Sequence, residues 1–416
     1  MENVLEKSAL SGVQKFARHH IFNLLAQMET GGLILEENGE TYRFGQIEAP
    51  LQGRLRVHSP AFYSRVLFGG SVAAGETWVE SLWSSPNLLN VIRIFARSLA
   101  LVERLENRMA WLRKPAQMLW QLSTRNTQSG SRANIAAHYD LGNDMYQIFL
   151  DPMMQYSSAI FPFTEASLAQ AQLHKVKIIC EKLQLQPGDE ILEIGSGWGG
   201  LACHMASHFD CRVTTTTLSQ AQYEFAKKMI TERGLQNKID LLLQDYRELE
   251  GEYDKIVSVE MIEAVGHDFL PAYFRHLGGL LKPTGRMLIQ AITIADQRYR
   301  QYRHSQDFIQ RYIFPGGALP SLSEMCRHLC QQTDMTVNAV SSHGKDYAQT
   351  LNLWQQSFNG NAERLAQLGY DGDFQRLWQF YFAYCEAGFR EGAIDLLQFE
   401  AKKPEARRCR DGNGFS

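Results

Sequence analysis

The sequence predicts an α/β protein built on a doubly wound, mostly parallel sheet, and three observations carry this prediction. Short apolar runs typical of buried strands alternate with helical patterns over residues 168–294. The run 191–194 leads directly into a turn that contains Gly195, Gly197 and Gly200, and a helical pattern follows the turn. A buried strand, a glycine turn and a helix in this order form the first βαβ unit of a Rossmann-like sheet.

The glycine turn indicates a ligand that approaches the backbone closely, because glycine adopts dihedral angles that a Cβ atom forbids. The spacing of the glycines alone fits sites for NAD, FAD and S-adenosylmethionine (SAM). A dinucleotide site would place Asp or Glu about 20 residues after the glycines. The strand predicted over 212–217 is followed there by Thr217 and Gln222, without an acid.

Polar residues stand at the ends of the other predicted strands. Glu193 lies near the end of the first strand, and the strand predicted over 239–243 is followed by Asp245 and Tyr246, an acid and a ring suited to an adenine. This pattern is commoner in SAM-dependent methyltransferases than in other proteins with the same turn. A glycine turn in another kind of α/β domain is the alternative.

Composition bounds the class of protein. The chain has 416 residues, which suggests two or three domains, and its 44% hydrophobic content supplies a globular core. No apolar stretch is long enough for a transmembrane helix, and the start lacks a secretion signal. Seven scattered cysteines without a CxxC pair favour reduced thiols in the cytoplasm over disulfides or a zinc site. We therefore expect a cytoplasmic protein without a metal.

Charge is uneven along the chain. The net charge is −3, with +3 in residues 1–130 and −6 in the remainder. Within the basic part, a helical pattern over 88–113 places Arg93, Arg97, Arg104 and Arg108 opposite an apolar side. Such a helix suits an anionic phospholipid surface, and an ordinary solvated helix face is the alternative. The acidic C-terminal part argues against nucleic-acid binding.

Four segments are expected along the chain. They are a small α+β domain over 1–113, a linker over 114–132, a catalytic domain over 133–401 and a frayed basic tail over 402–416. The elements expected in the first domain are a helix over 12–28, strands over 33–35 and 55–57 with the hairpin signal Glu-Asn-Gly-Glu between them, and a helix over 59–67.

The catalytic domain is expected to begin with a polar and aromatic lead-in over 134–163 that folds over the ligand. A helix over 168–183 precedes the first strand. Further on, a strand over 256–259 ends in Glu260 and Glu263. The later elements expected are a helix over 269–280, a turn over 281–285, a strand over 286–294, an insertion over 295–321 and an aromatic-rich helical region over 373–399.

Nine stretches together resemble the cyclopropane fatty acid synthase family, which includes the mycolic acid cyclopropane synthases and related SAM-dependent lipid methyltransferases. In chain order they are HYDLGNDMY (138–146), MQYSSAIF (154–161), LEIGSGWGGLA (192–202), TLSQAQ (217–222), QDYREL (244–249), VSVEMIEAVGH (257–267), RYIFPGGALPS (311–321), DYAQTL (346–351) and FAYCEAGFREGAIDLLQF (382–399). They span nearly the whole chain from residue 133. The stretch 58–83 looks like the additional domain of the phospholipid-acting members, which suggests a lipid-handling role for the N-terminal domain.

The resemblance implies a SAM site and a substrate. The residues expected to hold SAM are Tyr156, Ser157, Glu193, Gly195, Ser196, Gly197, Trp198, Gly199, Gly200, Thr217, Leu218, Gln222, Asp245 and Tyr246. The implied substrate is an unsaturated acyl chain of membrane phospholipid, reached from the inner membrane surface. A homodimer is one assembly that fits this expectation, although the sequence does not fix the oligomeric state.

The resemblance also implies a bicarbonate ion that acts as base. Its expected positions are Ser158, Glu263, Gln290, Ile292 and Tyr347, and Cys385 matches a cysteine proposed as catalytic in the family. Two positions depart from the family, which has Cys at Ser158 and His at Gln290. Glutamine cannot carry a positive charge, so its presence weakens the holding of an anion.

The chemistry expected from these residues is methyl transfer to a carbon–carbon double bond. Removal of a proton from the transferred methyl group closes a cyclopropane ring, whereas removal from the chain leaves a methyl- or methylene-branched product. We expect Glu263 to organise or supply the base with Tyr347 as its partner; a helix cap is the alternative role of Glu263. For Cys385 a packed helix thiol is the favoured interpretation. The rival functions are methylation of a small molecule at nitrogen or oxygen, and a lipid-binding protein without activity.

Overall fold

The structure, a computed structural model, describes residues 10–99, 102, 126 and 142–406. Most of the expected linker and the tail beyond residue 406 lie outside this part. The chain divides into two compact units, which are described separately. Unit 1 comprises Met1–Trp120, Gln306–Arg311 and Asn361–Glu391, and unit 2 comprises Gln121–Ser305, Tyr312–Gly360 and Gly392–Ser416.

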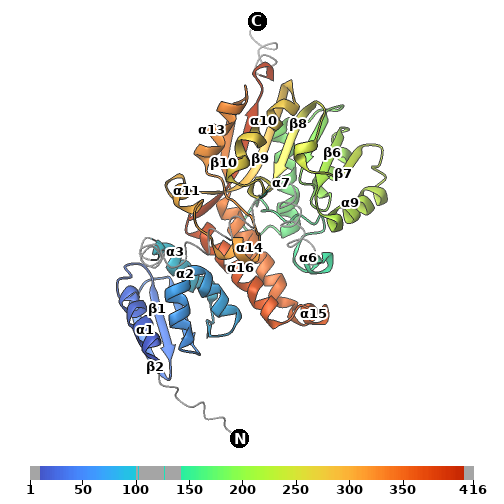
Figure 1. Cartoon of the computed structure of the whole chain (residues 1–416). Coiled ribbons are helices and arrows are strands. Elements are labelled where there is room, and N and C mark those ends of the chain that lie inside the picture. The colour runs from blue at the N-terminus through green and yellow to red at the C-terminus, as the bar shows by residue number, and fades with distance from the viewer. Residues whose placement is uncertain (1–9, 100–101, 103–125, 127–141, 407–416) are drawn as a thin grey trace. The chain divides into compact units, whose positions relative to one another are not determined.

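Unit 2 is built on a seven-stranded sheet with the strand order β10-β11-β9-β8-β5-β6-β7 (Figure 1). The strands are β5 (Glu190–Ile194), β6 (Arg212–Thr217), β7 (Ile239–Leu243), β8 (Tyr253–Val259), β9 (Leu281–Ile294), β10 (Thr336–Ser342) and β11 (Ile394–Lys402). Strands β5 to β9 run parallel, and β11 pairs antiparallel with both β9 and β10. The predicted Rossmann-like α/β class is confirmed.

Helices cover both faces of this sheet (Figure 1). The helices of unit 2 are α6 (Asn143–Phe149), α7 (Leu168–Leu183), α8 (Gly200–His208), α9 (Gln220–Glu232), α10 (Leu270–Leu280), α11 (Asp296–Tyr302), α13 (Leu322–Gln332) and α14 (Gly344–Gly360), with short 3₁₀ turns η1 (Tyr246–Glu248), η2 (Ile262–Ala264) and η3 (His267–Phe269). Helix α12 (Phe308–Tyr312) belongs to unit 1 except for its last residue. Neighbouring residues of β5 face opposite sides, so Ile191 joins a core with α7 and α8, while Leu192 joins a core with α10 and α13.

Local sequence explains where the helix before the first strand begins and ends. The side chains of Ser167 and Gln170 form a capping box at the start of α7, and Gln184 ends the helix in the left-handed conformation with φ 55°. The predicted bounds 168–183 match the observed helix. These two ends fix which residues of α7 are helical and therefore which of them face the sheet.

Two predictions for the end of unit 2 were wrong. The strand expected to start at 286 begins at Leu281, so the expected turn over 281–285 belongs to β9. The helical region expected over 373–399 ends at Arg390, and the last part of it forms β11. Leu396, Leu397 and Phe399 are buried because β11 pairs with β9 inside the sheet, where apolar side chains cover both faces. Lys402 closes this strand and is not part of a frayed tail.

Unit 1 holds a four-stranded sheet with the order β2-β1-β3-β4. Its elements are α1 (Gly12–Leu25), β1 (Gly32–Glu37), β2 (Glu40–Gly45), β3 (Gln52–Val57), α2 (Ala61–Val79), β4 (Trp83–Ser84), α3 (Leu88–Arg97), α15 (Ala362–Gln367) and α16 (Gly372–Arg390). The turn at Asn38 and Gly39 joins β1 to β2, whereas β3 runs parallel to β1. The predicted hairpin partner 55–57 was therefore wrong, because β2 was missed.

Helix α2 continues past residue 67, where it was expected to end from the sequence. Gly70 has φ 65°, which places a kink inside the helix, and the chain resumes helical structure up to Val79. Buried Trp78 anchors the second half, since its indole N–H donates to the carbonyl oxygen of Arg376 on α16 at 3.1 Å.

Helix α16 belongs to unit 1, although the sequence placed residues 133–401 in one catalytic domain. Its buried aromatic side chains, with Trp78 of α2, explain why it packs there. Glu391, directly after α16, accepts hydrogen bonds from Arg93 and Arg97 of α3, both at 2.6 Å. The described half of the expected basic stripe is thus engaged by an acid within unit 1, and Arg104 and Arg108 lie outside the described residues.

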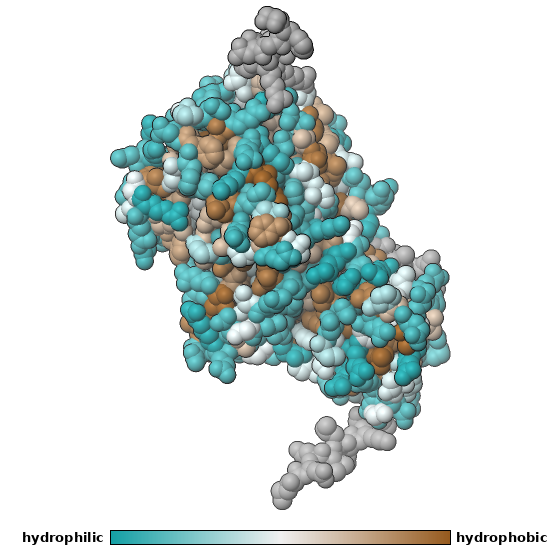
Figure 2. Space-filling view, turned by 180° about the vertical axis from the view of Figure 1, so that it is seen from behind, coloured by the Kyte–Doolittle hydropathy of each residue, from teal (hydrophilic) through white to brown (hydrophobic). Residues whose placement is uncertain are grey.

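The surface shown in Figure 2 carries apolar residues in small groups interrupted by polar ones. Among the described residues, no helix combines the length and the hydropathy that crossing a bilayer requires.

Candidate functional site

The polar residues predicted from the strand ends meet at the carboxyl edge of the parallel sheet of unit 2, where open α/β sheets bind ligands. The glycine turn lies there between β5 and α8. The N–H groups of Gly195 and Ser196 donate to the carbonyl oxygen of Thr216 on β6, at 3.1 and 2.8 Å. Gly200 has no room for a side chain, since an added Cβ would lie 2.4 Å from the carbonyl oxygen of Met153.

The middle of the turn has open space above it. Gly195, Gly197 and Gly199 have φ of 94°, 50° and 90°, in the left-handed region that favours glycine. A Cβ added at Gly197 would meet nothing within 4 Å. The turn thus leaves a backbone surface accessible to a ligand. Next to it, buried Trp198 donates through its indole N–H to Oδ1 of Asn143 at 2.7 Å, which ties the turn to α6.

The segment after β6 is ordered by its own side chains. The Thr217 hydroxyl donates to Oε1 of Gln222 at 2.8 Å and accepts from the N–H of Ser219 at 3.1 Å. Leu218 lies in the bend between them. Both Thr217 and Gln222 are buried, so this polar pair is fixed at the sheet edge.

The acid after β7 is held by a neighbouring arginine. Buried Asp245 accepts from Nε and Nη2 of Arg247 at 2.8 and 2.6 Å. Tyr246 packs edge-on against Tyr273 of α10, with ring centroids 5.4 Å apart, and burial raises the pKa of its hydroxyl to about 12. The expected adenine-binding acid and ring therefore come from a rigid 3₁₀ turn.

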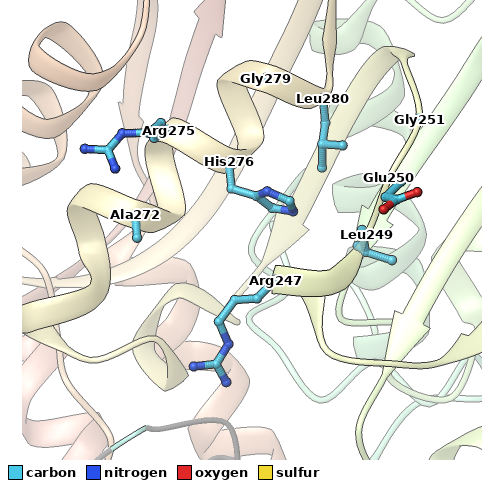
Figure 3. A pocket seen from close by; sticks show the side chains of 9 residues that line it. All are labelled: Arg247, Leu249, Glu250, Gly251, Ala272, Arg275, His276, Gly279 and Leu280. Atoms are coloured by element: carbon cyan, nitrogen blue, oxygen red, sulfur yellow. The ribbon is translucent and has the colours of Figure 1, made fainter.

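A surface cavity of about 650 Å³ lies between α10 and the segment formed by η1 and the loop that follows it (Figure 3). Arg247 and His276 line it, and the His276 ring points from α10 toward the loop that carries Leu249 and Glu250. Of its lining residues, Arg247 also binds Asp245. None of the predicted site residues lines this cavity.

Glu193 lies deep in the sheet, 3% exposed, and its Oε2 accepts from the Thr215 hydroxyl of β6 at 2.5 Å. Burial raises the pKa of the Glu193 carboxyl to about 8. The carboxyl therefore helps to fix β5 against β6 below the glycine turn.

Aromatic rings surround Tyr156 in the segment that leads into the sheet. Its ring centroid lies 5.1 Å from that of Tyr146, 5.3 Å from that of Trp354 and 6.3 Å from that of Phe314. The expected lead-in over 134–163 is thus packed from Gly142 onward, while residues 134–141 lie outside the described part.

The residue after Tyr156 reveals a group that the sequence analysis missed. The Ser157 hydroxyl accepts from Nζ of Lys175 on α7 at 2.7 Å. Lys175 has no exposed surface, and burial lowers the pKa of its ammonium group to about 8 against the opposing effects of Glu260 and Asp151. Lys175 occupies the apolar face of α7 beside Ala171 and Ile179, and a lysine at such a position is the signal that would have found it.

Glu260, which follows β8, is the centre of the second cluster. Its Oε1 accepts from the backbone N–H of Ser158 at 2.9 Å and from Nε2 of Gln290 at 2.8 Å. Its Oε2 accepts from the Tyr347 hydroxyl at 2.7 Å. Burial raises the pKa of the Glu260 carboxyl, and these three donors together with Lys175 oppose that rise. Three segments remote in sequence therefore donate hydrogen bonds to one carboxyl group.

Glu263 lies one turn further on. Its Oε1 accepts from the backbone N–H of Ile292 at 2.5 Å, and its Oε2 is buried without a hydrogen-bond partner among the described residues. Burial first, and Glu260 second, raise the pKa of the Glu263 carboxyl to about 8. Two buried carboxyls thus differ in environment: Glu260 is surrounded by donors and Glu263 is not.

Gln398 of β11 orients Gln290, and it too was missed from the sequence. Its Nε2 donates to Oε1 of Gln290 at 3.0 Å, and both residues are fully buried. Because Oε1 of Gln290 accepts from Gln398, the Gln290 amide presents its Nε2 to Glu260.

The residues expected to hold bicarbonate do not fit a bound ion in this arrangement. Of that set, Ser158, Gln290 and Tyr347 already donate to Glu260, and the N–H of Ile292 donates to Glu263. The Ser158 hydroxyl donates to the carbonyl oxygen of Ala159 at 2.8 Å. A carboxylate of the chain takes the donors that an anion would need.

Cys385 lies on α16, which belongs to unit 1. Burial, with a smaller effect of Asp307, raises the pKa of the Cys385 thiol. The thiol is therefore protonated and a weak nucleophile, which agrees with the interpretation as a packed helix residue.

Comparison with known proteins identifies the family. The model of the family described as mycolic acid cyclopropane synthetase matches residues 126–399. The chain belongs to this family. The cyclopropane-fatty-acyl-phospholipid synthase of Escherichia coli is 37% identical over 346 residues, which cover 83% of this chain and 86% of that protein. Tuberculostearic acid methyltransferase UfaA1 of Mycobacterium tuberculosis is 38% identical over 358 residues, covering 84% and 83%.

Solved structures of the mycolic acid cyclopropane synthetase family share the fold. The cyclopropane synthase MmaA2 from Mycobacterium tuberculosis has a TM-score of 0.61 and 30% identity, over 65% of this chain and 98% of that chain. CmaA1 complexed with SAH and CTAB has a TM-score of 0.61 and 31% identity, over 65% and 98%. The predicted SAM-dependent methyltransferase is thus confirmed, and SAM is its cofactor.

Proposed function

We propose that this protein is a SAM-dependent C-methyltransferase that acts on the double bond of an unsaturated fatty acyl chain of phospholipid and forms a cyclopropane ring. The observation that carries the proposal is the buried Glu260 carboxylate held by Ser158, Gln290 and Tyr347. A proton acceptor is not needed to methylate a strong nucleophile such as an amine, but it is needed after methylation of an alkene. The synthase of Escherichia coli named above supports the choice of substrate.

The chemistry assigns separate tasks to the residues. When bound, SAM supplies an electrophilic methyl group. Held by the SAM-binding residues named above, the cofactor would supply this methyl group to the alkene, and the adjacent chain carbon would then carry a positive charge. A negative charge fixed in a buried site stabilises such a cation more strongly than water does. Glu260 then accepts a proton from the transferred methyl group, and the released electron pair closes the ring.

The two carboxyls suit different protonation states at neutral pH. Burial raises the pKa of the Glu260 carboxyl, but Glu260 accepts three hydrogen bonds that oppose this rise and favour its ionised form, whereas Glu263 accepts only one from the other described residues. Glu263 has a pKa raised to about 8 by burial, so it holds its proton and can donate through Oε2. We assign the base to Glu260 in place of the expected bicarbonate, and a supporting hydrogen-bond role to Glu263.

The SAM-binding residues remain those expected from the sequence. The open backbone above Gly197, the Thr217 and Gln222 pair, and the turn with Asp245 and Tyr246 support their assignment. The expected SAM-binding residues also include Glu193, Ser157 and Tyr156. In the proposed reaction these groups bind and orient the cofactor and exclude water.

A branched product is the second candidate, because the same carboxylate can accept a proton from the chain as well as from the transferred methyl group. The product depends on which proton lies nearest the base, and Glu260 is fixed to the backbone whereas a bound ion could shift. A proton taken from the chain leaves a methyl-branched alkene instead of a ring. The name of UfaA1 supports methylation without ring closure in a relative of similar identity.

The test is incubation of the purified protein with labelled SAM and vesicles of monounsaturated phospholipid, followed by mass spectrometry and NMR of the fatty acids. We expect a gain of one CH₂ group, with NMR signals of a cyclopropane ring. Signals of the labelled carbon as a methyl or methylene group on a double bond would select the branched product instead. Absence of label in the acyl chains, with label in added amines, would contradict both candidates. Free fatty acid in place of vesicles tests the need for a bilayer surface.

Two carboxyl variants assign the base. Glu260→Gln removes the proton acceptor, and we expect kcat to fall by about 100-fold or more. Glu263→Gln keeps a hydrogen-bond donor at position 263, and its kcat should fall by about tenfold or less. Glu181→Gln, on the exposed side of α7, is the matched control. Full activity of Glu260→Gln would reject the assignment, and a larger loss in Glu263→Gln would return the base to Glu263.

A further inference from the structure

Lys175 is a fully buried ammonium group close to the proposed base. It lies on α7, and its Nζ donates to the Ser157 hydroxyl at 2.7 Å. A buried charge without compensation costs several kcal/mol, so Lys175 requires acidic partners in the interior. The acidic groups whose fields act on it are Glu260 and Asp151.

Asp151 is already committed to the backbone. Its carboxylate accepts from the N–H groups of Met153 and Gln155 at 2.9 and 2.8 Å, which fixes the turn that leads to Ser157. Asp151 is itself 4% exposed. It therefore compensates part of the charge of Lys175 and holds the lead-in segment, while Glu260 is the acid at the reaction site.

Lys175 is also connected to Glu260 through the backbone. Ser157, which accepts from Lys175, directly precedes Ser158, whose N–H donates to Oε1 of Glu260. The Ser157 carbonyl oxygen accepts from Nε2 of Gln172 at 2.8 Å, one turn earlier on α7. Helix α7 thus fixes Ser157 by two hydrogen bonds, and the N–H group of the next residue, Ser158, donates to the proposed base.

We infer that Lys175 is a positioning residue of the proposed reaction: its charge keeps the Glu260 carboxyl ionised, and its bond to Ser157 fixes the Ser158 N–H against it. This inference rests on the proposed function. The groups that face Glu260 are Lys175 from α7, Glu263 from η2, Gln290 from β9, Tyr347 from α14 and the Ser158 backbone. Burial and Glu263 favour the neutral form of Glu260, and Lys175 supplies the positive charge that opposes them.

The first test compares the pH dependence of kcat in the wild-type protein and four variants. The kcat of Lys175→Met should fall by about tenfold or more at neutral pH. On the acid side of its pH profile, kcat should already decline at a higher pH than in the wild-type protein, because Glu260 keeps its proton. Lys175→Gln retains a donor for Ser157 without a charge and should show the same shift. In Lys175→Arg, the pH dependence of kcat on the acid side should be the same as in the wild-type protein. Lys177→Met, on the exposed side of the same helix, is the matched control.

A loss that is uniform across pH would overturn the charge role, and full activity of Lys175→Met would overturn both parts of the inference.

A second measurement covers variants that fail to fold. The infrared spectrum of the wild-type protein at neutral pH, minus that of Glu260→Gln, should lack a band of a protonated carboxyl from Glu260. Such a band would overturn the inference. The spectrum does not depend on turnover, so it stays informative even if the wild-type protein methylates no lipid, which would contradict the proposed function alone.

Discussion

The glycine turn and the carboxylate cluster lie at the same edge of one sheet but are specified in different ways. The turn from Gly195 to Gly200 is local, and its geometry follows from the backbone needs of consecutive residues. The cluster around Glu260 draws its donors from three separate segments, at Ser158, Gln290 and Tyr347. The comparison teaches that a binding surface can be encoded by one short stretch, whereas a proton acceptor in the interior depends on the whole fold around it.

The largest effect is expected at the carboxylate cluster. Glu260 has φ 50°, a conformation that glycine adopts readily, so Glu260→Gly should fold and leave the donors free to bind an anion. We expect kcat to fall by about 100-fold or more and to recover in part with added formate or bicarbonate. Assays with and without the anion measure this recovery.

Glu260→Gln is the matched control for that experiment, because its side chain still fills the space and should prevent rescue. Equal rescue of the two variants would show that the anion acts elsewhere. Undiminished activity of Glu260→Gly without an anion would remove Glu260 from the mechanism.

The next effect concerns the stability of the glycine turn. In Gly200→Ala the added methyl group would lie 2.4 Å from the carbonyl oxygen of Met153, and a backbone atom cannot move away easily. We expect the free energy of unfolding to fall by about 1–3 kcal/mol, measured by denaturant titration. Gly279→Ala on α10 is the control, since nothing lies within 4 Å of its added Cβ. Equal stability of the two variants would contradict the close packing of the turn.

A smaller effect is expected from the pH dependence of stability. Burial raises the pKa of Glu193 from its ordinary 4.5 to about 8, so between these values the folded protein keeps a proton that the unfolded chain releases. The free energy of unfolding should therefore fall as pH rises from about 5 to 8. Glu193→Gln should reduce that slope, and Glu232→Gln on the exposed side of α9 should not. An unchanged slope in Glu193→Gln would contradict a protonated Glu193.

The smallest effect is expected at Cys385. Its thiol is kept protonated by burial and belongs to unit 1, so Cys385→Ala should keep kcat within about twofold of the wild-type value. The lipid assay with labelled SAM measures this. Loss of activity with an unchanged melting temperature would give the thiol a role in the reaction after all.

Much of unit 2 could be predicted because its signals are local. The helix over 168–183 was located to the residue by its amphipathic pattern, and the glycine turn indicated the fold class. Strand β2 and the antiparallel strand β11 were missed. The alternating pattern of Glu40–Gly45 is half exposed, and Ile394–Lys402 follows a helix after three residues, so neither carries a strong period of its own.

The candidate site was predicted only in part for a related reason. Ser158, Gln290 and Tyr347 were named together, but as holders of a free ion. That Glu260 fills their centre depends on the left-handed backbone at its own position, which a sequence does not display. Lys175 and Gln398 act through groups more than 15 residues away, so only the folded chain connects them to the base.

The left-handed backbone at Glu260 has a consequence for the conditions under which the protein works. An acceptor that is covalently part of the polypeptide is present at one equivalent per molecule, whatever gas is dissolved in the medium. With Glu260 as the proposed base, turnover should then be the same in buffer purged of carbon dioxide and in buffer equilibrated with air.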